Sequence, residues 1–154
     1  RNSSPAGMPL WRIQMPVNGT DIVSIARTWL DVPFRHQGRS RHGVDCGGLL
    51  LMVATDAGLS VAAPTVYSMS PDPDMIADTL QTNGTRLQFR DQHPGDVLLF
   101  SFAGEPRHVG IASELAGHPA VIHAWAKPGK VVEHRIDDLW HKRLRAVYRL
   151  RGLA

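Results

Sequence analysis

The hydrophobic pattern changes its period part way along the chain, and this change limits the possible folds more than any other feature. After a helix-start signal at 18–21, apolar residues recur at the i, i+3, i+4, i+7 spacing of one buried helix face: Ile22, Ile25, Ala26 and Trp29. Beyond Gly95 the apolar segments are short and separated by turn residues, as in antiparallel strands: 97–100, 108–113, 121–126, 131–136 and 145–150. Helices followed by strands predict an α+β fold.

A second helix is predicted after a basic, glycine-rich loop. Asp45 is a good N-cap for this helix, and Gly58 fits its C-terminal end. Residues 64–85 are rich in Pro, Asp, Ser and Thr, which predicts a long surface loop with at most a short helix over 74–80. We interpret residues 1–17 as an extended N-terminal arm and residues 18–154 as a single domain.

Composition narrows the class of protein. The chain has 154 residues, of which 43% are hydrophobic and 20% charged, as is typical of one globular domain. Its formal net charge of +3 favours nucleic acid only weakly, and the arginines of 135–151 are better explained by a solvated strand edge than by a base-stacking surface. We therefore predict no nucleic-acid partner. Because no apolar run approaches the ~20 residues of a membrane helix and residues 1–20 lack a signal-peptide pattern, we also predict no membrane span.

The single cysteine, Cys46, cannot form an intramolecular disulfide and must act as a thiol or thiolate. It lies in the first turn of the second predicted helix, where unpaired backbone N–H groups and the helix dipole favour the thiolate. Gly47 and Gly48 follow, where side chains would obstruct a substrate carbonyl that approaches those N–H groups. The alternative is a buried cysteine that only fills space, followed by glycines that let the helix press on a sheet. Residue types alone leave both interpretations open.

A nucleophilic cysteine needs a base, and two of the eight histidines lie in apolar strand segments. His108 begins one segment and His123 lies in the middle of the next, so neighbouring antiparallel strands could bring them within hydrogen-bonding distance. In that arrangement His108 takes the thiol proton and His123 fixes its tautomer. The other six are expected to be solvated, since they lie in turn-like or charged sequence: His36, His42, His93, His118, His134 and His141.

A zinc site is the main alternative for part of this region. Its ligands would be His36, His42, Asp45 and Cys46. Their spacing does not match that of zinc fingers, and the chain has no second cysteine. We predict no metal and no cofactor.

Three separated motifs resemble those of the NlpC/P60 family of papain-like cell-wall cysteine peptidases. Asp45-Cys46-Gly47-Gly48, His108-Val109-Gly110-Ile111 and Ile122-His123-Ala124 are similar, in order and spacing, to the family's Asp-Cys-Ser-Gly, His-Val-Gly-Ile and third-polar-residue signatures. Residues 25–34 resemble the helix and Pro-Tyr segment before the nucleophile. The segment 129–135 and the arginine-rich last strand look most like the phage-encoded branch. The resemblance covers residues 21–150.

The resemblance implies a minimal papain-like fold, in which the helix with Cys46 packs on an antiparallel sheet. It implies that Cys46 is the nucleophile, His108 the base and acid, and His123 the orienting residue. Asp45 matches a position that in many members binds the free amine of the first alanine of a peptidoglycan stem peptide. Gly47 replaces the usual serine and Phe34 the usual tyrosine. We expect the loss of these two hydroxyls at the substrate site to alter substrate preference rather than to prevent catalysis.

The function implied is hydrolysis of an amide in peptidoglycan stem peptides, commonly the γ-D-glutamyl to diaminopimelate bond. The setting would be a phage tail, a prophage or a toxin delivered into competing cells, with phage tail proteins or a cognate immunity protein as partners. The protein would be made in the cytoplasm and act in the periplasm or at the cell wall. Two alternatives stay open: a catalytically silent wall-binding or tail-assembly module, and a thiol acyltransferase or deamidase that uses the same triad.

Overall fold

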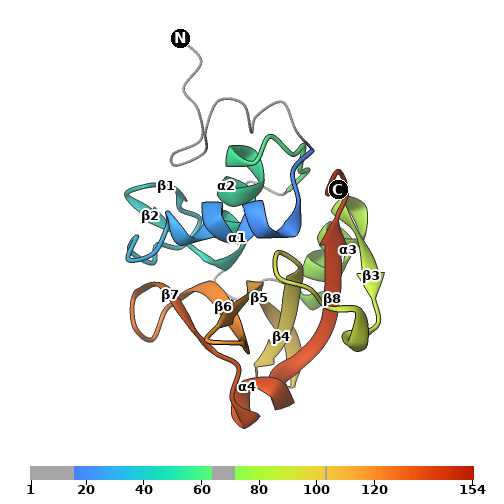
Figure 1. Ribbon diagram of the computed structural model, residues 1–154. Helices are drawn as coiled ribbons and strands as arrows, with labels where there is room; N and C mark the ends of the chain where they lie inside the picture. Colours follow the sequence, from blue (N-terminus) through green and yellow to red (C-terminus); the bar gives the residue numbers. More distant parts are fainter. Residues whose placement is uncertain (1–15, 64–71, 103) are drawn as a thin grey trace.

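The computed structural model describes residues 16–63, 72–102 and 104–154, and Figure 1 shows the arrangement of their elements. The helices are α1 (Gly19–Arg27), α2 (Cys46–Asp56), α3 (Pro73–Asn83) and α4 (Asp138–Arg143), with a 3-10 turn at Phe89–Asp91. The strands are β1 (Arg39–Ser40), β2 (Gly43–Val44), β3 (Gly84–Leu87), β4 (Val97–Phe102), β5 (Glu105–Leu115), β6 (His118–Trp125), β7 (Lys130–Arg135) and β8 (Leu144–Leu150). Residues 1–15 of the predicted arm and 64–71 of the predicted loop lie outside the described residues.

The first helix begins at the predicted signal. The Asn18 side chain accepts the Asp21 N–H and the Asp21 carboxylate accepts the Asn18 N–H, each at 3.0 Å. This reciprocal pair satisfies two backbone donors that the first turn would otherwise leave unpaired. The predicted apolar face is buried, although α1 ends at Arg27 and Trp29 lies in the turn that follows.

Six strands form one antiparallel sheet in the order β3-β8-β4-β5-β6-β7. Strands β4 to β7 are sequential neighbours, and β8 returns to pair with β4 on one side and β3 on the other. Each predicted strand segment is confirmed, with ends shifted by a few residues. The α+β class is confirmed as well.

The sheet separates two apolar layers. On one face Ile111 and Ile122 pack with residues of α1 and α2 such as Ile22 and Leu49. On the other face Ala112 and Val121 pack with Trp140 of α4. Strand alternation produces this division, because adjacent residues point to opposite faces. Figure 1 shows α1 and α2 together on one side of the molecule and α4 at the opposite end.

The middle of the chain differs from the prediction. Instead of a short helix over 74–80 within a loop, α3 extends over Pro73–Asn83 and leads directly into β3. Asp72 caps the helix by accepting the Asp74 N–H at 2.9 Å, and Pro73 occupies its first turn. The polar residues that suggested a loop therefore form the start and the exposed side of an amphipathic helix, while Leu80 is buried.

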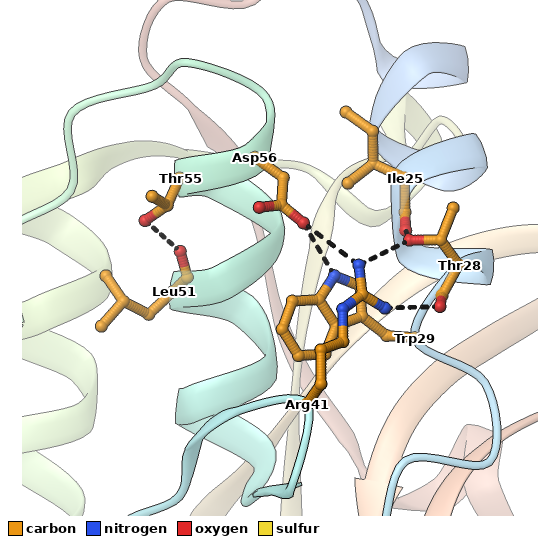
Figure 2. A network of polar contacts seen from close by, with 7 residues as sticks. All are labelled: Ile25, Thr28, Trp29, Arg41, Leu51, Thr55 and Asp56. Atoms are coloured by element: carbon orange, nitrogen blue, oxygen red, sulfur yellow. Dashed lines mark hydrogen bonds and ion pairs between the residues drawn. The ribbon is translucent and has the colours of Figure 1, made fainter. Parts of the chain in front are cut away.

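A polar network holds α1, α2 and the β1–β2 hairpin together (Figure 2). The Arg41 guanidinium lies 3.7 Å from the centre of the Trp29 ring and donates to the Thr28 carbonyl at 2.6 Å. Asp56 of α2 accepts the Trp29 indole N–H at 3.0 Å and pairs with Arg41 at 3.6 Å. The hairpin is thus anchored on both helices, just before the chain reaches Cys46.

The two glycines after Cys46 have different structural roles. A Cβ at Gly48 would overlap the carbonyl oxygen of Gly38, so the helix and the preceding loop touch backbone to backbone there. A Cβ at Gly47 would meet nothing closer than Asp45 Oδ1 at 4.0 Å. Of the two interpretations left open by the sequence, close packing therefore applies to Gly48, although its neighbour is the backbone of a loop and not a sheet.

We expect Gly48→Ala to lower the free energy of unfolding by about 1–3 kcal/mol, because the loop at Gly38 must move away from the helix. Gly47→Ala is the matched control and should be neutral or stabilise by up to about 1 kcal/mol, since alanine is the better helix former. Urea unfolding followed by circular dichroism measures both. Equal stability of the two variants would contradict the assigned contact.

Candidate active site

Cys46 is the first residue of α2, and the Asp45 carboxylate holds the backbone around it. Oδ1 of Asp45 accepts the Gly48 N–H at 2.7 Å, and Oδ2 accepts the Gln37 N–H at 2.8 Å. The predicted N-cap is confirmed. Because Asp45 is only 5% exposed, both bonds form with little competition from water. One side chain therefore fixes the start of the helix and its distance from the preceding loop.

Cys46 and His108 line the same pocket, whose volume is about 360 Å³. Asp45, Gly47 and Phe34 line it as well. Its remaining wall is largely apolar and includes side chains of α2 and α3: Leu50, Leu51, Met75, Ile76 and Leu80. The structure thus gathers at one pocket every residue that the sequence selected, except His123, which lies fully buried behind His108.

Three imidazoles form a continuous chain across strands β5, β6 and β7. His108 Nε2 lies 2.6 Å from His123 Nδ1, as the sequence predicted for neighbouring strands. His123 Nε2 lies 2.8 Å from His134 Nε2, and His134 Nδ1 lies 2.9 Å from the carbonyl oxygen of Arg135. Gly110 allows β5 and β6 to pack closely beside these rings, because a Cβ there would lie 2.5 Å from Val121 Cγ2 and 3.2 Å from the His123 Cβ.

His134 is a member of the site that the sequence reasoning missed. It was expected to be solvated, because Glu133 and Arg135 flank it. In the structure it is half-buried and shares a sheet face with His123, since Val132 is the register partner of His123. Strand alternation places residues 130, 132 and 134 on that face. The signal was therefore present in the alternation, but the charged neighbours obscured it.

Aromatic rings surround the three imidazoles. The ring of Trp140, from α4, lies 4.9 Å from that of His123, 5.1 Å from that of His134 and 6.1 Å from that of His108, measured between ring centres. Trp125 stacks on His123 with centres 5.6 Å apart. These rings help to bury His108 and His123, so the hydrogen bond between those two imidazoles has few competing partners.

Burial favours the neutral forms of both reactive groups. Burial raises the pKa of the Cys46 thiol to about 11, against the opposing effect of the Val109, Gly47 and Cys46 backbone N–H groups. It also lowers the pKa of His108 to about 3, and the nearby Arg143 and His134 add to that shift. The pKa of His123 falls to about 2 for the same main reason.

The resting pocket therefore holds a neutral thiol and a neutral imidazole in its wall. The backbone N–H groups at the helix start favour the thiolate, as expected from the sequence, but the loss of hydration on burial outweighs them.

Two further properties concern binding and location. Within 16–63, 72–102 and 104–154, no three side chains of His, Cys, Asp or Glu are grouped so that they could hold a metal ion. In the same part of the chain, no helix is both long enough and apolar enough to cross a membrane.

The helix that begins with Cys46 and the antiparallel sheet that carries the histidines together define a minimal papain-like fold. The profile of the NlpC/P60 family matches residues 31–149, and the chain belongs to this family. The predicted family and fold are thus confirmed.

The matching proteins agree with this assignment. A "Probable endopeptidase" of Corynebacterium glutamicum is 29% identical over 119 residues, which are 77% of this chain and 49% of that protein. The "Murein DD-endopeptidase MepS/Murein LD-carboxypeptidase" of Escherichia coli is 25% identical over 75% of this chain and 54% of its own length. The chain spans about half the length of these curated relatives.

Solved structures show the same fold. An NlpC/P60 family protein from Bacillus cereus superposes with a TM-score of 0.66 at 18% identity, over 88% of this chain and 41% of its own. The NlpC/p60 domain of the peptidoglycan hydrolase SagA gives a TM-score of 0.63 at 21% identity, over 87% of this chain and 100% of its own.

The neutral resting pair predicts how the thiol reacts with iodoacetamide in the absence of substrate. Since the thiol pKa is raised to about 11, the thiolate fraction and the alkylation rate should rise about tenfold per pH unit from pH 7 to 10. Intact-mass measurement of a pH series gives these rates, and Cys46→Ala reports any reaction elsewhere. A rate that is already constant between pH 6 and 8 would indicate a thiolate–imidazolium pair and contradict this assignment.

Proposed function

We propose that this chain is a cysteine endopeptidase that hydrolyses an amide bond in peptidoglycan stem peptides. The observation that carries the proposal is the arrangement of Cys46 and His108 at one pocket, with His123 hydrogen-bonded behind His108. Family membership supports the substrate class, as does the similarity to a protein named as a murein endopeptidase.

Attack on the amide is coupled to proton transfer, because the resting pair is neutral. The proton of Sγ passes to His108 Nδ1, the ring nitrogen that does not contact His123, as a bond forms between Sγ and the carbonyl carbon. The carbonyl π electrons move to oxygen. The backbone N–H groups of Cys46 and Gly47, which face the sulfur, would hold this oxyanion.

Collapse of the intermediate completes the transfer to water. The C–N bond breaks as the His108 imidazolium gives its proton to the leaving amine, and a thioester remains on Cys46. His108 then takes a proton from water, the hydroxide attacks the thioester, and the proton returns to sulfur. The low pKa of His108 makes its imidazolium a strong acid, which suits the protonation of a poor leaving group.

We propose the γ-D-glutamyl to diaminopimelate bond as the one cut, and the periplasm or the cell wall as the place of action. A role in a phage particle or as a delivered toxin stays a prediction from the resemblance of the last strands. Purified Gram-negative peptidoglycan, incubated with the protein and analysed by mass spectrometry, identifies the bond. Hydrolysis splits a stem and adds water, acyl transfer adds an acyl group, and a silent binding module leaves the stem unchanged.

Cys46→Ala should lower the release of stem fragments by roughly a thousandfold or more, because the nucleophile and its base act as one unit. The side chain is small and half-buried, so the variant should unfold at nearly the wild-type urea concentration. Comparison of the two unfolding curves separates loss of chemistry from loss of structure. Fragment release at the wild-type rate would falsify the thiol mechanism.

Substitution of Asp45 tests the predicted binding of a free amine of the substrate. If its carboxylate pairs with the amine of the first alanine, a charge-assisted contact of about 1.5–3 kcal/mol is at stake, or roughly tenfold to hundredfold in kcat/KM. A stem tetrapeptide with a free amine should therefore be cut faster than its N-acetylated form, and Asp45→Asn should reduce the difference. Asparagine can still cap the helix through its Oδ1, but its Nδ2 cannot accept the Gln37 N–H, so urea unfolding of the variant must accompany the rate comparison. Equal rates on the two peptides would leave Asp45 with its structural role alone.

A further inference from the structure

We propose that His134 is a positioning residue of the active site, which sets the protons of His123 and His108 so that Nδ1 of His108 is a free base. The inference rests on the proposed function, because a free base matters only if Cys46 reacts. It is carried by the contacts of His134, which link the imidazole chain to the backbone of β7.

The direction of the hydrogen bonds follows from the last partner in the chain. A carbonyl oxygen can only accept, so His134 Nδ1, at 2.9 Å from the Arg135 oxygen, carries a proton. In the neutral ring Nε2 then has the lone pair and accepts from His123 Nε2 at 2.8 Å. His123 Nδ1 is left as an acceptor for His108 Nε2 at 2.6 Å. The remaining nitrogen, His108 Nδ1, has a lone pair for the thiol proton.

Burial makes this order difficult to reverse while His134 is present. His123 is 0% exposed, so an N–H at its Nε2 cannot donate to bulk water. Without an acceptor at position 134, that N–H would be left unpaired at a cost of about 1–3 kcal/mol. The ring can avoid this cost by moving its proton to Nδ1.

Such a proton shift on His123 would change the tautomer of His108, the proposed base. A proton on His123 Nδ1 donates to His108 Nε2, which must then accept, and the proton of His108 moves to Nδ1. In that tautomer His108 cannot take the proton of Cys46. Loss of His134 would thus inactivate the base through the hydrogen bonds of His123, although His134 does not itself line the pocket.

Two variants at position 134 distinguish the effect of a hydrogen-bond acceptor from the effect of side-chain volume. His134→Gln places an amide oxygen where it can accept from His123, whereas His134→Leu fills similar space without an acceptor. His118→Leu is the matched control, since His118 is exposed at the start of β6 and belongs to no part of the site. Urea unfolding of all three variants shows whether each remains folded.

The decisive measurement is the tautomer of His108, read from imidazole nitrogen chemical shifts in the full chain labelled with ¹⁵N-histidine. In the wild type, His134→Gln and His118→Leu, we expect the His108 proton on Nε2. In His134→Leu we expect a measurable fraction on Nδ1, together with a fall in kcat/KM on the order of tenfold to a thousandfold. Rescue by glutamine would support an acceptor role rather than a packing role.

The result that would overturn the proposal is a His134→Leu protein whose His108 proton stays on Nε2. Such a result would make any loss of activity an effect of packing. The spectra need no substrate, so they decide the role of His134 even if the wild type releases no fragments from peptidoglycan. That second result would instead contradict the proposed function.

Discussion

The site depends on the carboxylate of Asp45 more than on any other single group. Its two oxygens accept backbone N–H groups from both sides of the nucleophile, one from the first turn of α2 and one from the loop before β1. An uncapped helix start would fray, and with it the position of Cys46. The Arg41 network fixes the adjacent β1–β2 hairpin, through Trp29 and Asp56. Cys46 therefore sits at the meeting point of two independently anchored segments.

The reactivity of the site results from a balance between burial and backbone polarity. The N–H groups at the start of α2 favour a thiolate, yet the protein around the sulfur removes more hydration than they replace. The same burial keeps His108 and His123 neutral. A neutral pair is less reactive towards adventitious electrophiles than an ion pair, and it needs a correctly oriented base to react at all. Any reaction of the thiol therefore depends on the orientation of the imidazole chain rather than on a permanent thiolate.

Much of the fold could be predicted from local patterns, because period and caps are local properties. The helix starts at Asn18 and Asp45 and the strands that carry His108 and His123 follow from spacing alone. The features that could not be predicted depend on contacts between distant parts of the chain. The proximity of Gly48 to Gly38 and the burial of Cys46 arise from packing that no short window of sequence contains, and the contact of His134 with His123 depends on how β7 pairs with β6. His134 is the clearest case, because its charged neighbours are typical of solvent while its strand register places it against a buried ring.

The imidazole chain ends on a main-chain atom, the carbonyl of Arg135, and this has a consequence for how the sequence can vary. No side-chain replacement removes a backbone carbonyl, so position 135 itself is free to change in chemical character. The length of the β6–β7 hairpin is not free in the same way. Insertion or deletion of one residue in its turn at 126–129 would shift the pairing of β7 by one position and turn residue 134 to the opposite face of the sheet. Among homologous chains, the length of this turn should thus be more constrained than the residues that form it.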